Sequence, residues 1–121
     1  MNLTHIQIVS VPVLDQDRAK AFYVNTLGFE LRSDAPFGEG QRWVEVAPKG
    51  AQTALSLVNW FPSMPAGSLK GLVLATDDVE AAYQELAARG VQFHGPIQDA
   101  IWGRWATFDD SEGNGWVLRG C

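Results

Sequence analysis

The order of apolar and polar residues predicts alternating strands and helices. Residues 4–11 are rich in β-branched side chains and predict a strand, which ends at Pro12 because proline cannot donate a ladder hydrogen bond. A helix follows, with Asp15 or Asp17 as its N-cap, and Gly28 suits the left-handed residue after its end. Its apolar face, at helical spacing, consists of Ala19, Phe22, Tyr23 and Leu27.

Three further strands are predicted after this helix, at residues 29–32, 41–46 and 53–58. A loop at residues 34–40 and a turn at residues 48–50 separate them, because both segments contain proline and glycine. Residues 60–68 hold further prolines and a glycine, and they predict a linker.

The same order then begins again. Residues 72–75 predict a strand, Asp77 or Asp78 caps a second helix, and Gly90 ends that helix. The apolar face of this helix consists of Val79, Ala82, Tyr83, Leu86 and Ala87. The remaining strands are predicted at residues 91–93, 102–108 and 116–118, the last two joined by a tight turn.

The chain is therefore interpreted as an internal duplication of a strand, a helix and three strands. We predict an α+β fold in one domain, residues 1–121, made of two βαβββ modules at about 1–60 and 70–121. A single helix covers only one face of the sheet in each module. Two such modules can curl their uncovered faces around a cleft, where a ligand would bind.

Composition narrows the choice of partners. The net charge is −5 and no run of lysine or arginine occurs, which disfavours nucleic acid and anionic membrane surfaces. No apolar run approaches the roughly 18 residues that span a bilayer. The first five residues do not resemble a signal peptide, and the single cysteine, Cys121, cannot form an intrachain disulfide. We therefore expect a cytoplasmic protein without a membrane or nucleic-acid partner.

Three segments resemble one known family, the glyoxalase/bleomycin-resistance/extradiol-dioxygenase superfamily, also called the vicinal oxygen chelate superfamily. Residues 14–29 resemble its first helix, and residues 76–81 with Gly90 and Val91 resemble its second helix. Residues 108–114 resemble its closing F-x-D-P-x-G-N turn, with Ser111 at the usual proline. The segments occur in the family's order over the whole chain, so the resemblance implies glyoxalase-like curved sheets around a cleft.

Enzymes of this superfamily hold a divalent metal with histidine and glutamate side chains from four strands. Counted from the helix caps, the corresponding positions here hold Ile8, Gly71, Leu55 or Ser56, and Val117. None of these residues is expected to bind a metal. His5 falls on the opposite strand face from Ile8, and His94 is interpreted as a loop residue. The resemblance therefore implies this fold without a metal, and we expect no cofactor.

Five tryptophans in 121 residues point to a binding surface or an unusually aromatic core. The segment from Trp102 to Trp105 resembles the W-G-R segment of the superfamily's antibiotic-binding members, whose clefts hold a drug by stacking, without chemistry. We predict a ligand site lined by Trp43, Glu45, Leu55, Trp60, Trp102, Arg104, Trp105 and Val117.

Each assignment in this predicted site has an alternative. The tryptophans could pack in the core, and Arg104 could pair with an acidic residue of the other half. On the third strand, the face of Trp43 and Glu45 could line the cleft, or the opposite face that carries Val44 could do so. The sequence leaves this choice open.

The leading functional hypothesis is a metal-independent protein that binds an aromatic small molecule, with antibiotic sequestration or resistance as its role. One alternative is a glyoxalase- or dioxygenase-like enzyme, a lyase or isomerase, using a divalent metal or none; the sequence assigns no catalytic residue. Another is a regulatory module with a filled cleft. We expect a homodimer, because each open sheet needs a partner to cover its apolar face.

Overall fold

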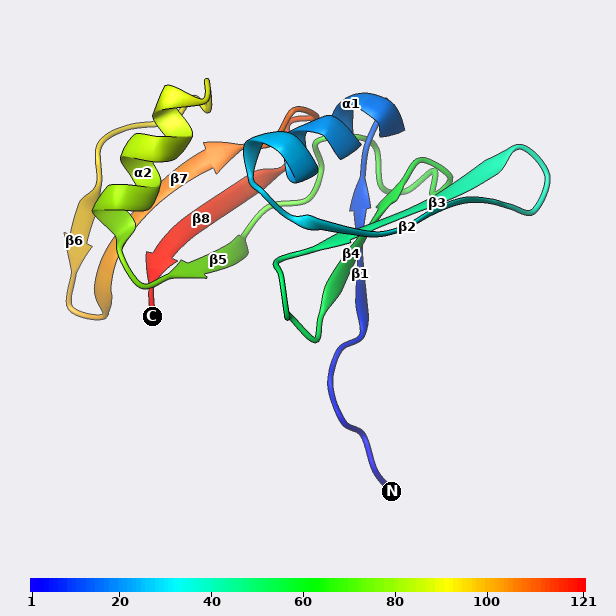
Figure 1. Ribbon diagram of the computed structural model, residues 1–121, viewed down its shortest axis with the longest axis horizontal. Helices are drawn as coiled ribbons and strands as arrows, with labels where there is room; N and C mark the ends of the chain where they lie inside the picture. The colour runs from blue at the N-terminus through cyan, green and yellow to red at the C-terminus, as the bar shows by residue number, and fades with distance from the viewer.

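Two four-stranded mixed sheets form the molecule, in a computed structural model that describes residues 1–121 (Figure 1). The first sheet has the order β1-β4-β3-β2 and consists of β1 (Ile8–Pro12), β2 (Glu30–Phe37), β3 (Gln41–Ala47) and β4 (Ala54–Val58). The second has the order β5-β8-β7-β6 and consists of β5 (Leu72–Thr76), β6 (Gln98–Ala100), β7 (Gly103–Asp109) and β8 (Gly115–Gly120). In each sheet the first and last strands of the module pair in parallel, and the other pairs are antiparallel. This repeated plan confirms an α+β fold of two βαβββ modules, whose sheets remain open.

The helices are α1 (Gln16–Ala21), which continues into the π-helical turn η1 (Phe22–Thr26), and α2 (Val79–Ala88). Asp15 and Asp78 are the N-caps, because their carboxylates accept hydrogen bonds from backbone N–H groups of the first turns. Gly28 and Gly90 follow the helices at φ of 77° and 95°, as their positions in the sequence predict. Neither helix has the length and apolar character that a membrane crossing demands.

Three element boundaries differ from the sequence-based expectation. The first strand begins only at Ile8, and residues 34–37, expected in a loop, belong to β2. Pro36 is tolerated there because β2 is an edge strand that pairs only with β3. The strand expected at residues 91–93 is wrong: the Val91 N–H donates to the carbonyl of Leu86 at the helix end, and only a single bridge forms, at Phe93. The sheet edge is instead β6.

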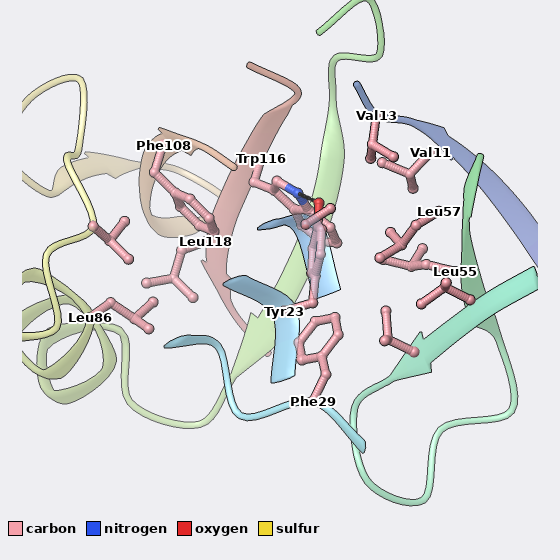
Figure 2. Packing of buried hydrophobic residues seen from close by; sticks show 14 of the residues in the cluster. Val11, Val13, Tyr23, Phe29, Leu55, Leu57, Leu86, Phe108, Trp116 and Leu118 are labelled. Atoms are coloured by element: carbon pink, nitrogen blue, oxygen red, sulfur yellow. Dashed lines mark hydrogen bonds between the residues drawn. The ribbon is translucent and has the colours of Figure 1, made fainter. Parts of the chain in front are cut away.

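Both sheets pack their helix-facing sides into one hydrophobic core. Figure 2 shows Tyr23 between the two modules, with Leu57 on the first-sheet side and Leu118 on the second-sheet side. The Tyr23 ring lies 5.9 Å from the ring of Trp116, and the Trp116 Nε1–H donates a 2.9 Å hydrogen bond to the Tyr23 hydroxyl oxygen. Since the two sheets share one core on the helix side, their opposite faces lack a helical cover.

The turn between β7 and β8 ties the two modules together. The buried Asp110 carboxylate accepts hydrogen bonds from the Tyr23 hydroxyl at 2.5 Å and from the Asn114 side-chain amide at 3.0 Å. The same amide donates to the Pro12 carbonyl at the end of β1, at 2.7 Å. Burial and the nearby Asp110 charge raise the pKa of the Tyr23 phenol far above its usual range, so it stays a hydrogen-bond donor.

Glu112 of the same turn holds the start of α1. Its carboxylate accepts the backbone N–H groups of Leu14 and Asp15, both at 3.0 Å, and pairs with the Arg18 guanidinium at 2.8 Å. Burial opposes ionisation of Glu112, but these hydrogen bonds prevail and lower its pKa to about 2. The closing turn that resembles the family motif is therefore a structural joint between the modules.

Candidate ligand-binding site

Strand alternation decides which side chains lie on the helix-free face of the first sheet. Val44 and Val46 on β3 have no exposed surface and lie in the core, so Trp43 and Glu45 lie on the opposite face. This settles the orientation that the sequence left open. We call that surface the first open face; its residues are Phe37, Trp43, Glu45, Ser56 and Trp60.

Aromatic rings cover one end of the first open face. The Trp60 ring centroid lies 6.4 Å from that of Trp43, with an interplanar angle of 29°. Phe37, at the end of β2, lies 5.0 Å from Trp60 and meets Trp43 edge-on at 5.6 Å. These rings are all partly exposed, and they offer stacking surfaces to a planar ligand.

Two polar side chains lie next to this aromatic surface. Glu45 accepts a 3.0 Å hydrogen bond from the Trp43 Nε1–H through one carboxylate oxygen, which holds the indole in place. Ser56 on β4 is in register with Glu45, and its buried Oγ has no hydrogen-bond partner. An unmatched buried hydroxyl is costly, but Ser56 has no exposed surface, so a ligand could bond it only if a covering side chain moved aside.

The second sheet has a corresponding uncovered surface, the second open face, formed by Val73, Trp102, Trp105, Val117 and Arg119. Trp116 and Leu118 on β8 are buried at 4% and 1% exposure, so Val117 and Arg119 point away from the core. Val73 on β5 is in register with Val117 and is 54% exposed. These two valines give the surface an apolar floor.

Two indoles and one guanidinium lie along the second open face. Trp102 stacks on Trp105, with ring centroids 6.0 Å apart and an interplanar angle of 29°. The Arg119 guanidinium carbon lies 4.9 Å from the Trp102 ring centroid, within the range of a cation–π contact. Trp102 is nevertheless 53% exposed, so part of its side chain remains accessible.

His94 lies beside the second open face but is held by neighbouring side chains. Its Nδ1 lies 2.8 Å from the hydroxyl of Thr107, which is in register with Val117. Its Nε2 lies 3.2 Å from the Asp109 carboxylate. Both ring nitrogens of His94 therefore contact neighbouring side chains of the second sheet.

Two residues of the predicted site lie elsewhere. Leu55 packs in the core, and its neighbour Ser56 takes the position on the first open face. Arg104 precedes Trp105 on β7 and therefore points to the helix side, where it pairs with Glu80 of α2 and Asp99 of β6, both at 3.1 Å. Both ion pairs lie within the second module. The alternative considered from the sequence, a pair between Arg104 and an acidic residue of the other half, is therefore wrong.

Sequence reasoning did not single out Arg119. A usable signal was present, because Arg119 stands two residues after Val117 and must share its face if β8 continues. Trp43, Glu45, Trp60, Trp102, Trp105 and Val117 all lie on or beside the open faces, whereas Trp116 is the tryptophan of the core.

The positions that the family resemblance assigns to metal ligands hold Ile8, Leu55 or Ser56, Gly71 and Val117. These side chains include no imidazole, thiolate or carboxylate, and no group of three or more such residues is placed to hold a metal. The donor set therefore does not fit a divalent metal.

The pronounced hollows of a single chain do not contain the first open face. One lies where α2 and β5 of the second module meet residues 27–29 and 48–49 of the first, and its lining includes Phe29, Leu74, Leu86 and Arg89. Smaller hollows reach Trp102 and Trp105 at the margins of the second open face. Both open faces are thus surfaces rather than enclosed cavities in one chain.

Comparison with known proteins gives consistent matches over the whole chain. Residues 3–118 match the model of the Glyoxalase/Bleomycin resistance protein/Dioxygenase superfamily. The structure of TnmS3, an antibiotic binding protein from Streptomyces sp. CB03234, is similar at 53% identity and a TM-score of 0.93, covering 99% of this chain and 98% of that one. A superfamily member from Sphaerobacter thermophilus DSM 20745 has 36% identity and a TM-score of 0.90, with 98% of each chain covered. YetH of Bacillus subtilis (strain 168) is 35% identical over 120 residues, covering 97% of this chain and 98% of its own.

Proposed function

Because this chain belongs to the Glyoxalase/Bleomycin resistance protein/Dioxygenase superfamily, we propose that it is a metal-independent protein that binds a planar aromatic small molecule. Sequestration of an antibiotic is the proposed role. The observation that carries the proposal is the placement of four tryptophans outside the core, in two stacked pairs on the open faces: Trp43 with Trp60, and Trp102 with Trp105. The similarity to TnmS3, which is described as an antibiotic binding protein, supports it.

The energetics of tryptophan support a binding role for these pairs. Burying an indole is strongly favourable, and a large exposed apolar patch on a protein surface is typical of an interaction site. Trp102 remains 53% exposed although the same module buries Trp116 to 4%. A flat aromatic ligand that stacked on these rings would bury the apolar surface that the free protein leaves exposed to water.

A ligand held on one open face alone would keep its other side in water. We therefore propose a homodimer in which the open face of one subunit is covered by a second copy. β1 and β5 are edge strands, and Val73 beside β8 is 54% exposed, so each subunit offers unpaired strand edges and apolar surface. A two-fold arrangement would create two equivalent clefts with the predicted aromatic lining.

The polar residues of the first open face would then orient the ligand. Glu45 uses one carboxylate oxygen for Trp43 and keeps the other free of protein partners, and the Ser56 hydroxyl is unmatched. A hydrogen-bond donor on the ligand would meet the carboxylate, and a hydroxyl or carbonyl would meet Ser56 once the side chain that covers it moved aside. Metal-dependent catalysis is not proposed, because no three histidine, cysteine, aspartate or glutamate side chains lie together where they could hold a metal ion.

The test is a thermal-shift screen of planar polycyclic antibiotics against smaller aromatic and non-aromatic controls. Binding to the native state raises its stability by RT ln(1 + [L]/Kd), so a ligand at 100 times its Kd adds about 2.7 kcal/mol. We expect polycyclic compounds to raise the Tm of the protein. Mass spectrometry of the compound released afterwards should show an unchanged mass. No shift with any planar compound, or conversion of the compound to a product, would contradict the proposal.

A further inference from the structure

Arg119 is the one arginine of the chain without a carboxylate partner. Each of the others pairs with an aspartate or glutamate within 3.5 Å: Arg18, Arg32, Arg42, Arg89 and Arg104. The protein has 14 acidic residues against 9 lysines and arginines, so acidic partners are not scarce. An exposed guanidinium on the second open face that takes none of them is therefore available to a ligand.

The surroundings of Arg119 explain why it has no partner. On the neighbouring strands its register partners are Trp105 of β7 and Ala75 of β5, and neither carries a charge. The nearest acidic residue along that face of β7 is Asp109, which lies four residues beyond Trp105 and already contacts His94. The fold thus places a single cation among aromatic and apolar side chains.

The contact with Trp102 leaves the hydrogen-bonding capacity of Arg119 unused. A guanidinium that stacks on an indole presents its flat face to the ring and keeps its in-plane N–H groups for bidentate bonds to a carboxylate. The contact with Trp102, 4.9 Å from the guanidinium carbon to the ring centroid, also keeps the guanidinium close to the indole. A ligand ring that lies on the same face of Trp102 as the guanidinium, over the part of the indole that Arg119 and Trp105 leave exposed, would meet those N–H groups at its own edge.

We propose that Arg119 determines specificity by binding an anionic oxygen, a carboxylate or phenolate, on the edge of the aromatic ligand. This proposal rests on the proposed function, because it assumes that the ligand stacks on the second open face. Arg119 then selects among planar ligands of similar size, and Trp102 and Trp105 supply the affinity that all of them share.

Three ligands of one ring system test this selection: 9-anthracenecarboxylate, 9-anthracenemethanol and 9-(aminomethyl)anthracene. Their Kd values would be measured by fluorescence titration at low ionic strength for the wild type, Arg119→Gln and Arg119→Lys. Arg104→Gln is the matched control, since Arg104 lies on the adjacent strand but points towards α2. Melting temperatures verify that every variant is folded.

The proposal predicts that the wild type binds the carboxylate about tenfold more tightly than the alcohol, a difference of about 1.4 kcal/mol. Arg119→Gln should remove this preference and leave the affinity for the alcohol unchanged. Arg119→Lys should keep part of the preference, because a lysine retains the charge without the bidentate fork. The control Arg104→Gln should bind all three ligands as the wild type does.

Failure of this inference can be told apart from failure of the proposed function. Equal binding of carboxylate and alcohol by the wild type, or a carboxylate preference that survives in Arg119→Gln, would overturn the role of Arg119 and leave aromatic binding intact. If Arg119→Gln lost the dimer but kept the carboxylate preference, the role of Arg119 in specificity would also be overturned. Arg119 would then contribute to the contact between subunits. If none of the three anthracenes binds the folded wild type, both proposals are contradicted.

Discussion

The hydroxyl of Tyr23 in the first module donates a 2.5 Å hydrogen bond to the buried carboxylate of Asp110 in the second module. The same hydroxyl oxygen accepts the indole N–H of Trp116, so one side chain satisfies two buried polar groups. Tyr23 and Trp116 lie in the core that both modules share (Figure 2). The bond from Tyr23 to Asp110 connects the helix of one half to the closing turn of the other.

Tyr23→Phe should lower the free energy of unfolding by about 1–3 kcal/mol, because it leaves Asp110 and the Trp116 N–H without this partner. Urea unfolding monitored by circular dichroism measures the change. Tyr83→Phe is the matched control at the corresponding position of α2, where the half-buried hydroxyl donates to the Gly95 carbonyl at 3.1 Å. A loss at Tyr23 no larger than that at Tyr83 would contradict this role of the bond.

Stability should fall at acid pH partly through Glu112. Its folded-state pKa of about 2 lies below the ordinary value of 4.5, so its contribution is complete above pH 4.5 and is lost as pH falls towards 2. After allowance for solvent at the half-exposed Arg18, we expect Glu112→Gln to cost about 2 kcal/mol at pH 7 and little at pH 2. Unfolding curves across this range measure the difference.

Glu39→Gln is the control for this titration, since Glu39 is an exposed glutamate of the β2–β3 connection without a hydrogen bond or ion pair to the protein. Its substitution should change stability by less than about 0.5 kcal/mol at either pH. If the Glu112→Gln difference stayed constant from pH 7 to pH 2, the carboxylate charge would not be what holds the start of α1.

Trp102→Ala should weaken binding of a planar ligand by about 1–3 kcal/mol and reduce stability by less than about 1 kcal/mol, because the indole is 53% exposed. Trp116→Ala should cost about 3–5 kcal/mol of stability, because that ring is buried in the core. Melting temperature and affinity measured on the same samples separate the two roles. A Trp102 variant with full affinity would remove this ring from the site.

Ser56→Ala should leave the stability of the free protein unchanged or raise it by up to about 1 kcal/mol, because the buried hydroxyl has no hydrogen-bond partner. If the ligand bonds this hydroxyl, the same change should reduce affinity by about 0.5–1.5 kcal/mol. Calorimetric titration and thermal unfolding measure both quantities. A clear loss of stability in the free protein would show that Ser56 bonds within the fold.

Much of the fold could be predicted because local signals agree with the tertiary structure. Pro12 ends β1, and Gly28 and Gly90 end the helices at positive φ, since these positions depend on backbone chemistry alone. The signals failed where tertiary context decided. Pro36 lies within a strand because β2 is at the sheet edge, and Val91 closes a helix although it reads as a strand residue.

The site was harder to predict, because strand parity reverses the role of neighbouring residues. Leu55 and Ser56 were both candidates for one position, and only the packing of Leu55 in the core assigns the open face to Ser56. Arg104 was predicted in the site because residues 102–105 resemble the W-G-R segment of antibiotic-binding members. In the structure it points to α2, whereas Arg119 shares the face of Val117. A resemblance between short motifs therefore predicts which segment lies near the site, but it does not predict which way each side chain points.

The most direct test of metal-independent aromatic binding is a calorimetric titration of the EDTA-dialysed protein with the polycyclic antibiotic that raises its Tm most. We predict saturable binding without added metal, recovery of the ligand unchanged, and binding weakened about tenfold or more in a folded Trp43→Leu/Trp105→Leu variant. Binding that requires a restored divalent metal, a chemically altered ligand, or an affinity that survives loss of both indoles would contradict the proposed function.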